Sequence, residues 1–110
     1  MSDKVKDNKH FIALLSGKIS KKQFEKLIET SSRDQVTAIC VILYNIGEGE
    51  VSKSDSVLKL FASKTTKKII KALHSKRNSI LKKRKILMAY KHVIFKILKL
   101  AGQKVIELLF

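Results

Sequence analysis

The chain has 110 residues, 45% of them hydrophobic, and its 24 Lys and Arg against 9 Asp and Glu give a formal net charge of +15. This length suits one domain, and such an apolar fraction excludes an intrinsically disordered chain. The single cysteine, Cys40, excludes an internal disulfide framework, and the sequence shows neither an apolar leader nor a long apolar run free of lysine. We therefore expect an intracellular protein that is neither secreted nor transmembrane.

The first predicted element is a helix over about residues 4–15. Gly17 follows it closely, at the place where a glycine often ends a helix. Apolar residues recur within it at spacings of three and four, which is the period of an amphipathic helix. The side chains expected to face inward are Val5, Phe11, Ile12, Leu14 and Leu15.

Two capping-box patterns mark the next helix starts. Ser20 is followed three residues later by Gln23, and Ser32 by Gln35, so we expect helices from about 21 to 30 and from about 33 to Gly47. The later helix contains QVTAICVILYNI, which is apolar on nearly every side, and should lie at the centre of the core with its cysteine buried. A buried strand is the alternative, since several of its residues are β-branched.

A polar connector, GEGEVSKSD, separates this core segment from the rest of the chain. Ser52 with Asp55 is a candidate cap for a fourth helix that carries Val57, Leu58, Leu60 and Phe61. A break or a continuation near SKTT then leads into KKIIKALHSKR, where the isoleucines and the leucine share one face and the lysines lie elsewhere.

The last segment is periodic from Ile80 to Phe110, with Asn78 and Ser79 as candidate caps. An unbroken helix here would be about 46 Å long, so either Gly102 interrupts it or its end packs on a second copy. The sequence therefore predicts one all-α domain over residues 1–110, a compact bundle of four or five helices with a long, amphipathic, basic C-terminal helix. Residues 1–50 would form a near-neutral core, and residues 64–110 a basic half.

The net charge belongs almost entirely to the C-terminal half. Residues 64–110 contain 14 Lys and Arg against the single Glu107, and no acidic residue lies between Asp55 and Glu107. Such self-repulsion is best tolerated when a polyanion is the usual partner, so we expect non-specific binding to the backbone of duplex nucleic acid. A solvated face and a membrane-binding face are the alternatives. The candidate nucleic-acid-binding residues are Lys67, Lys68, Lys71, Lys76, Arg77, Lys82, Lys83, Arg84 and Lys85.

The C-terminal segment also carries a broad apolar side, as surface-seeking helices do. The same pattern is typical of a core helix or of an interface between copies. The candidate membrane or oligomer contacts are Val93, Ile97, Leu100, Ile106, Leu109 and Phe110.

Catalytic and metal-binding patterns are missing from the sequence. His10, His74 and His92 are far apart and show no paired spacing with Cys40 or with carboxylates, so we expect surface histidines rather than metal ligands. There is no glycine-rich phosphate loop and no nucleophile elbow. We therefore expect neither an enzyme nor a cofactor.

Three stretches, LLSGKISKKQFEKLIETSSRDQVTAI, GEGEV and IIKALHSKRNSILKKRKILM, together resemble small lysine-rich proteins of Maverick/Polinton-type elements and adintoviruses. The tail departs from that pattern because it is amphipathic rather than glycine-rich, and the connector lacks the usual proline. The resemblance implies a genome-packaging or virion core protein located in the nucleus or the virion. A capsid cement or scaffold protein that binds acidic protein surfaces, and a membrane-active protein, are the rival functions. The positions that match the family's basic motif are Ile70, Lys71, Leu73, Lys76, Arg77, Ser79, Lys82, Lys83, Arg84, Lys85 and Leu87.

Overall fold

The computed structural model describes residues 3–49 and 53–110, and every regular element in these two ranges is an α-helix. The all-α prediction is therefore confirmed, although the described chain divides into eight helices rather than four or five. The helices are α1 (Asp3–Asp7), α2 (Lys9–Ser16), α3 (Lys21–Glu29), α4 (Arg33–Gly47), α5 (Asp55–Ala62), α6 (Lys64–His74), α7 (Ile80–Ala89) and α8 (Lys91–Leu109).

Both predicted capping boxes are present. The backbone N–H of Gln23 donates to Ser20 Oγ at 3.1 Å, and Gln23 Oε1 accepts from the backbone N–H of Ser20 at 3.0 Å. Ser32 and Gln35 repeat this exchange at the start of α4, at 2.8 and 3.1 Å. Each box satisfies backbone donors that a helix start leaves without a partner, which is why these local patterns predicted the two boundaries.

The caps of the later helices follow the same chemistry. Ser79 accepts from the backbone N–H of Lys82 and caps α7, as predicted. Ser54 accepts from the backbone N–H of Val57 at 3.3 Å and caps α5. The earlier candidate for that role, Ser52, lies outside the described residues.

The helix predicted over residues 4–15 breaks at Asn8, between α1 and α2. The Asn8 side chain donates to the backbone carbonyl of Lys4 at 2.8 Å, a local bond of the kind by which asparagine competes with helical backbone pairing. The break changes the direction of the chain, and Leu14, which was expected to face inward, is 47% exposed.

The long C-terminal helix is also divided, and the break falls at Tyr90 rather than at Gly102. Tyr90 has φ −113° and ψ 27°, which separates α7 from α8. The longest extent of the molecule is 32 Å, too short for an unbroken helix of about 46 Å. Gly102 instead lies inside α8, where a Cβ would collide with the backbone carbonyl of Ser16, so it allows α2 and α8 to approach closely.

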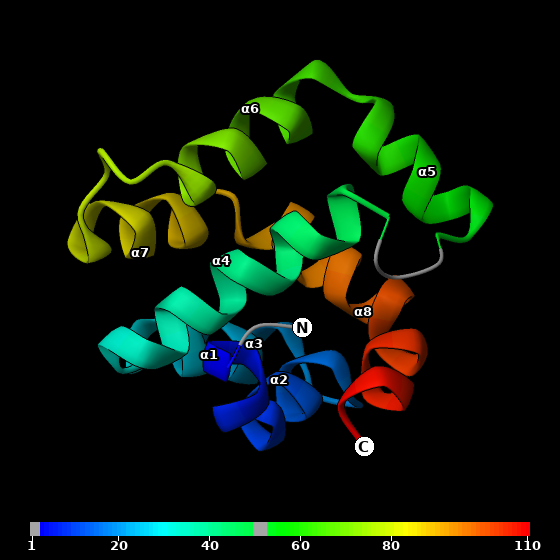
Figure 1. Ribbon diagram of the computed structural model, residues 1–110, viewed down its shortest axis with the longest axis horizontal. Helices are drawn as coiled ribbons and strands as arrows, with labels where there is room; N and C mark the ends of the chain where they lie inside the picture. Colours follow the sequence, from blue (N-terminus) through cyan, green and yellow to red (C-terminus); the bar gives the residue numbers. More distant parts are fainter. Residues whose placement is uncertain (1–2, 50–52) are drawn as a thin grey trace.

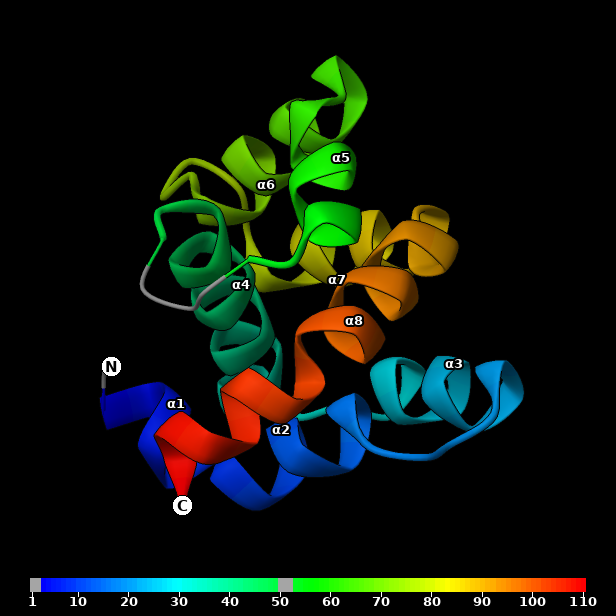
Figure 2. The same ribbon diagram turned by 90° about the vertical axis from the view of Figure 1, so that its right-hand side faces the viewer.

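The helix α4 lies at the centre of the core, as its all-round apolar sequence predicted. Figures 1 and 2 show α5 and α6 on one side of α4 and α1 and α2 on the other, while α8 crosses behind α4 toward the C-terminus. The helix pairs α2 with α8 and α4 with α6 are packed against each other. Fully buried side chains on α4 include Ile39, Ile42, Leu43 and Ile46. This arrangement leaves α6 and α7 with one face on the core and one face in solvent.

Candidate nucleic-acid interface

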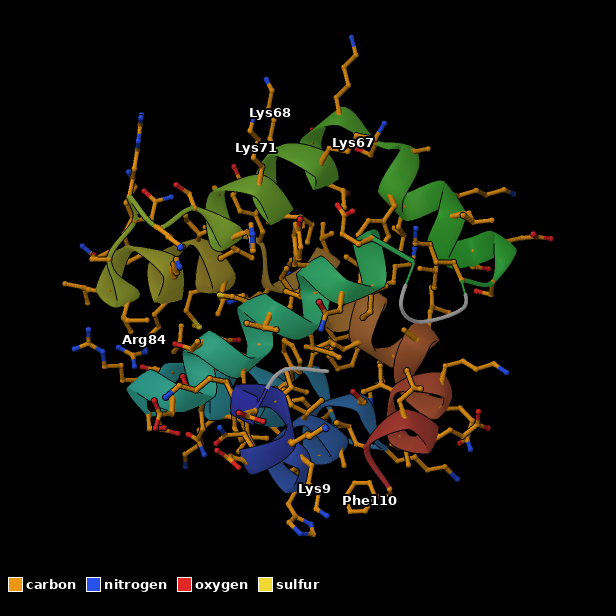
Figure 3. All side chains as sticks on the ribbon, in the orientation of Figure 1. Lys9, Lys67, Lys68, Lys71, Arg84 and Phe110 are labelled. Atoms are coloured by element: carbon orange, nitrogen blue, oxygen red, sulfur yellow. The ribbon has the colours of Figure 1, made fainter. Side chains whose placement is uncertain are left out.

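The outer face of α6 is a stripe of lysines. Thr66, Ile69, Ile70 and Leu73 are buried, so the 3.6-residue period places the lysines on the opposite side of the helix. In Figure 3, labelled side chains of this stripe extend from α6 away from the body of the molecule. The stripe consists of Lys64, Lys67, Lys68 and Lys71, all exposed.

This stripe is unfavourable for the helix itself. Lysines three or four positions apart repel one another, which destabilises a helix by about 0.2–0.5 kcal/mol per pair. Lys64 and Lys67 also lie in the first turn, where the helix dipole favours anions. Lys64 was not among the residues proposed from sequence, although its spacing of three, four and seven to the other lysines could have identified it.

The loop that joins α6 to α7 extends the basic surface. Lys76 and Arg77 are both exposed there. Asn78 Nδ2 donates to the carbonyl of Ala72 at 2.8 Å, and the backbone N–H of Arg77 donates to Ser75 Oγ at 3.2 Å. These bonds give the short loop a defined path, so its two cations continue the surface of α6 toward α7.

The run of four cations on α7 divides between solvent and the protein. Lys82 and Lys85 are exposed, whereas Lys83 and Arg84 are half-buried. Four consecutive helical positions cover all sides of the helix, so the cations could not all face one partner.

Arg84 is directed toward the protein. Its Nη2 donates to the backbone carbonyl of Ser31 at 2.6 Å, which links α7 to the turn between α3 and α4 (Figure 3). Its Nε is buried and finds no hydrogen-bond partner within the described residues. Arg84 is therefore a structural contact of α7, and only part of its charge is available to an external anion.

Lys83 lies close enough to Cys40 to affect the ionisation of its thiol. Burial raises the pKa of Cys40 from 9.0 to about 11, and the positive charge of Lys83 opposes this rise. Cys40 as a residue is 4% exposed, in agreement with the core position that the sequence predicted. It is accordingly a poor nucleophile at neutral pH.

The acidic residues of the described chain do not balance this surface. Three ion pairs form within residues 3–49 and 53–110, namely Lys4 with Asp34, Lys91 with Glu25 and Lys104 with Glu107. None of them includes a cation of residues 64–89. We call the exposed cations of this stretch the basic face; its members are Lys64, Lys67, Lys68, Lys71, Lys76, Arg77, Lys82 and Lys85.

The apolar residues predicted as membrane or oligomer contacts do not form one surface. Ile97 is fully buried, and Val93, Ile106 and Leu109 are half-buried. Phe110 is 63% exposed, but its ring lies 5.1 Å from the ammonium of Lys9 and 5.3 Å from the ring of His10 (Figure 3). Leu100, at 42% exposed, is the member of the set that is left most open besides Phe110.

The histidines predicted at the surface, His10, His74 and His92, are all exposed. In the part of the chain that the structure describes, no three His, Cys, Asp or Glu side chains gather in a way that could hold a metal ion.

None of the described helices combines the length and the apolar character that crossing a membrane requires. Comparisons of the chain with protein-family models, curated proteins and solved structures found no match.

Proposed function

We propose that this protein binds duplex nucleic acid through its basic face, by contacts to phosphates and without reading base sequence. The observation that carries the proposal is the segregation of eight exposed cations on α6, the following loop and α7, with no acidic residue between Asp55 and Glu107. The lysine stripe of α6 opposes helix stability, so a polyanion that neutralises it would relieve a repulsion as well as form new contacts.

The chemistry of the basic face favours backbone contacts over base readout. All but one of its members are lysines, and lysine is a point charge, whereas arginine supplies the planar pair of donors that recognises guanine. Phosphate neutralisation releases counterions, so the logarithm of the binding constant should fall with the logarithm of salt concentration by about 0.9 per phosphate contacted. Six to eight contacts would produce a slope of roughly −5 to −7.

The proposed biological role is genome packaging, and it rests on the resemblance to the lysine-rich proteins of Maverick/Polinton-type elements. Condensing a genome requires neutralisation of the backbone and no sequence preference, which is what a lysine-rich face supplies. Self-association on the nucleic acid is part of this proposal. A capsid cement or scaffold protein would instead remain bound to particles from which the genome is absent.

The test is binding of the full chain to a labelled random duplex over a range of salt concentrations. The informative variant is Lys67→Gln/Lys68→Gln/Lys71→Gln. Its matched control is Lys21→Gln/Lys22→Gln/Lys26→Gln, which removes the same charge from three exposed lysines on α3. We expect the α6 variant to reduce the magnitude of the salt slope by roughly 2 to 3, and the α3 variant to change it much less.

Equal effects of the two triple variants on the salt slope would contradict the assignment of the site. Duplex binding would then depend on the net charge of the protein and not on the position of the lysines. A slope near −1 for the unaltered protein would contradict duplex binding itself and favour an acidic protein partner. Release of dye from anionic vesicles by the full chain would favour the membrane-active alternative.

A further inference from the structure

A groove opens between the C-terminal end of α4, α5 and α6, on the side of α6 next to the lysine stripe. Its volume is about 530 Å³. Pockets that hold small organic molecules usually measure about 300–1,000 Å³, so this groove has the size of a ligand site. Nothing in the sequence pattern marked it, because its walls come from three separate helices.

Part of the lining of the groove is apolar, and we call this part its floor. Leu58, Phe61 and Ile70 contribute to it, and Leu58 is 50% exposed although it is a large aliphatic side chain. Two further lining residues, Tyr44 and His74, stack their rings in parallel with the centroids 3.6 Å apart. This leaves an uncovered apolar surface that is bounded by two stacked rings.

The lining also includes three lysines, and we call their ammonium groups the rim. Lys53, Lys67 and Lys71 line the groove, against Glu48 as the carboxylate among the described lining residues. Lys53 Nζ donates to the carbonyl of Gly47 at 2.8 Å and lies 5.5 Å from the centre of the Phe61 ring. These contacts hold the ammonium at the edge of the apolar floor, and an ammonium with three donors can still bind an anion there.

We infer that this groove binds a single-chain amphiphilic anion, of which a fatty carboxylate is the simplest example. The aliphatic chain would cover Leu58 and Phe61, and the anionic head would meet the ammonium groups of the rim. Charge complementarity supports this choice, because the described lining residues include three lysines and one carboxylate, which disfavours a cationic or neutral amphiphile. This function is additional to nucleic-acid binding, and Leu58 lies in the groove without belonging to the basic face.

The test is isothermal titration of the full chain with laurate, with dodecanol and dodecyltrimethylammonium as neutral and cationic probes of the same chain length. We expect one laurate per protein, bound at least tenfold more tightly than either control. Across octanoate, decanoate and laurate, affinity should increase about fourfold for each methylene that the groove covers. Binding of several laurates per chain, or equal affinity for the cationic probe, would overturn the inference.

Matched variants locate the site. Leu58→Gln places a polar group on the floor of the groove and should reduce laurate affinity at least tenfold, whereas Leu81→Gln, at a residue 60% exposed on α7, should leave it unchanged. Lys71→Gln should weaken laurate binding and Lys76→Gln should not, because Lys71 lines the groove and Lys76 does not.

Two further results separate this inference from its alternatives. Leu58→Gln should retain the duplex binding of the unaltered protein, so that failure of one proposal is distinguishable from failure of the other. Vesicles of anionic phospholipid, titrated in place of laurate, should bind equally well to the unaltered protein and to Leu58→Gln. Loss of vesicle binding in Leu58→Gln, without any laurate binding, would show that the groove meets a membrane rather than a free amphiphile.

Discussion

Residues 3–49 and residues 64–89 are both helical and pack around the same core, but they balance their charges differently. The first region mixes 8 Lys and Arg with 6 Asp and Glu, and Asp34 and Glu25 in it form ion pairs. The second region holds 10 Lys and Arg and no acidic residue. The charges of the first region therefore partly neutralise one another, whereas those of the second have no acidic neighbour within the region and are in no ion pair among the described residues.

A substitution in the core that α4 supplies should lower stability more than any other change considered below. Leu43 is fully buried on α4, so Leu43→Ala should lower the free energy of unfolding by about 2–5 kcal/mol through lost burial and a residual cavity. The matched control is Leu81→Ala in the basic region, which should change it by less than about 0.5 kcal/mol. Urea unfolding followed by circular dichroism measures both, and similar losses in the two variants would erase the distinction between the regions.

The second prediction concerns pH and the place where the two regions meet. The folded protein holds the Cys40 proton up to a pKa of about 11, above its ordinary value of 9.0. Between pH 9 and about pH 11 the folded chain binds more protons than the unfolded chain. The stabilisation that the thiol contributes is therefore fully present below pH 9 and is lost as the pH rises toward 11. The contribution of this thiol should decrease by about 2 kcal/mol between pH 8 and pH 11.

Cys40→Ala isolates that contribution, because it removes the thiol and leaves every other ionisable group of the chain in place. The difference in unfolding free energy between the unaltered protein and Cys40→Ala should shrink by this amount over the window. Parallel pH curves for the two proteins would show that the thiol is not protected by burial. Lys83→Met should raise the thiol pKa further, since it removes the charge that lowers it.

The third prediction separates two cations of the same run. Arg84→Met removes the donor to the buried residue Ser31 and should cost about 1–3 kcal/mol of stability. Lys82→Met, at an exposed position on the same helix, should change stability by less than about 0.5 kcal/mol. Comparable stabilities of the two variants in urea would mean that Arg84 belongs with the solvent-facing cations.

The smallest expected effect bears on the charge contrast directly. Lys67→Gln/Lys68→Gln/Lys71→Gln should stabilise the free protein by up to about 1 kcal/mol at low salt, because several like-charge pairs disappear from α6. The gain should fade as salt screens the remaining charges. The α3 variant should show no gain, since Glu25 and Glu29 neighbour its lysines. Urea unfolding midpoints of both variants and of the unaltered protein, at a low and a high salt concentration, measure this gain. A loss of stability in the α6 variant would contradict the prediction.

Much of the fold could be predicted because its signals are local. The capping boxes that begin at Ser20 and Ser32 each predict a helix start from four consecutive residues. The apolar face of α6 is predicted by the helical spacing of its apolar residues. The exposure of Leu14 and the break at Tyr90 were not predicted, because apolar residues recur at helical spacing on both sides of Asn8 and of Tyr90, so the sequence period marks neither break. Within the candidate site, the exposure of Lys67 and Lys71 followed from periodicity, but the inward position of Arg84 did not.

Patterns within single segments predict a helical chain, a central α4 and an excess of positive charge that lies almost entirely after residue 63, because helix propensity, hydrophobic period and charge are properties of one segment at a time. Packing between helices accounts for three other features: Arg84 donates to Ser31, Gly102 lets the backbone of Ser16 approach closely, and a groove forms between α4, α5 and α6. Each of these depends on which side chains meet across the core, and a pattern within one segment carries no information about what packs against it.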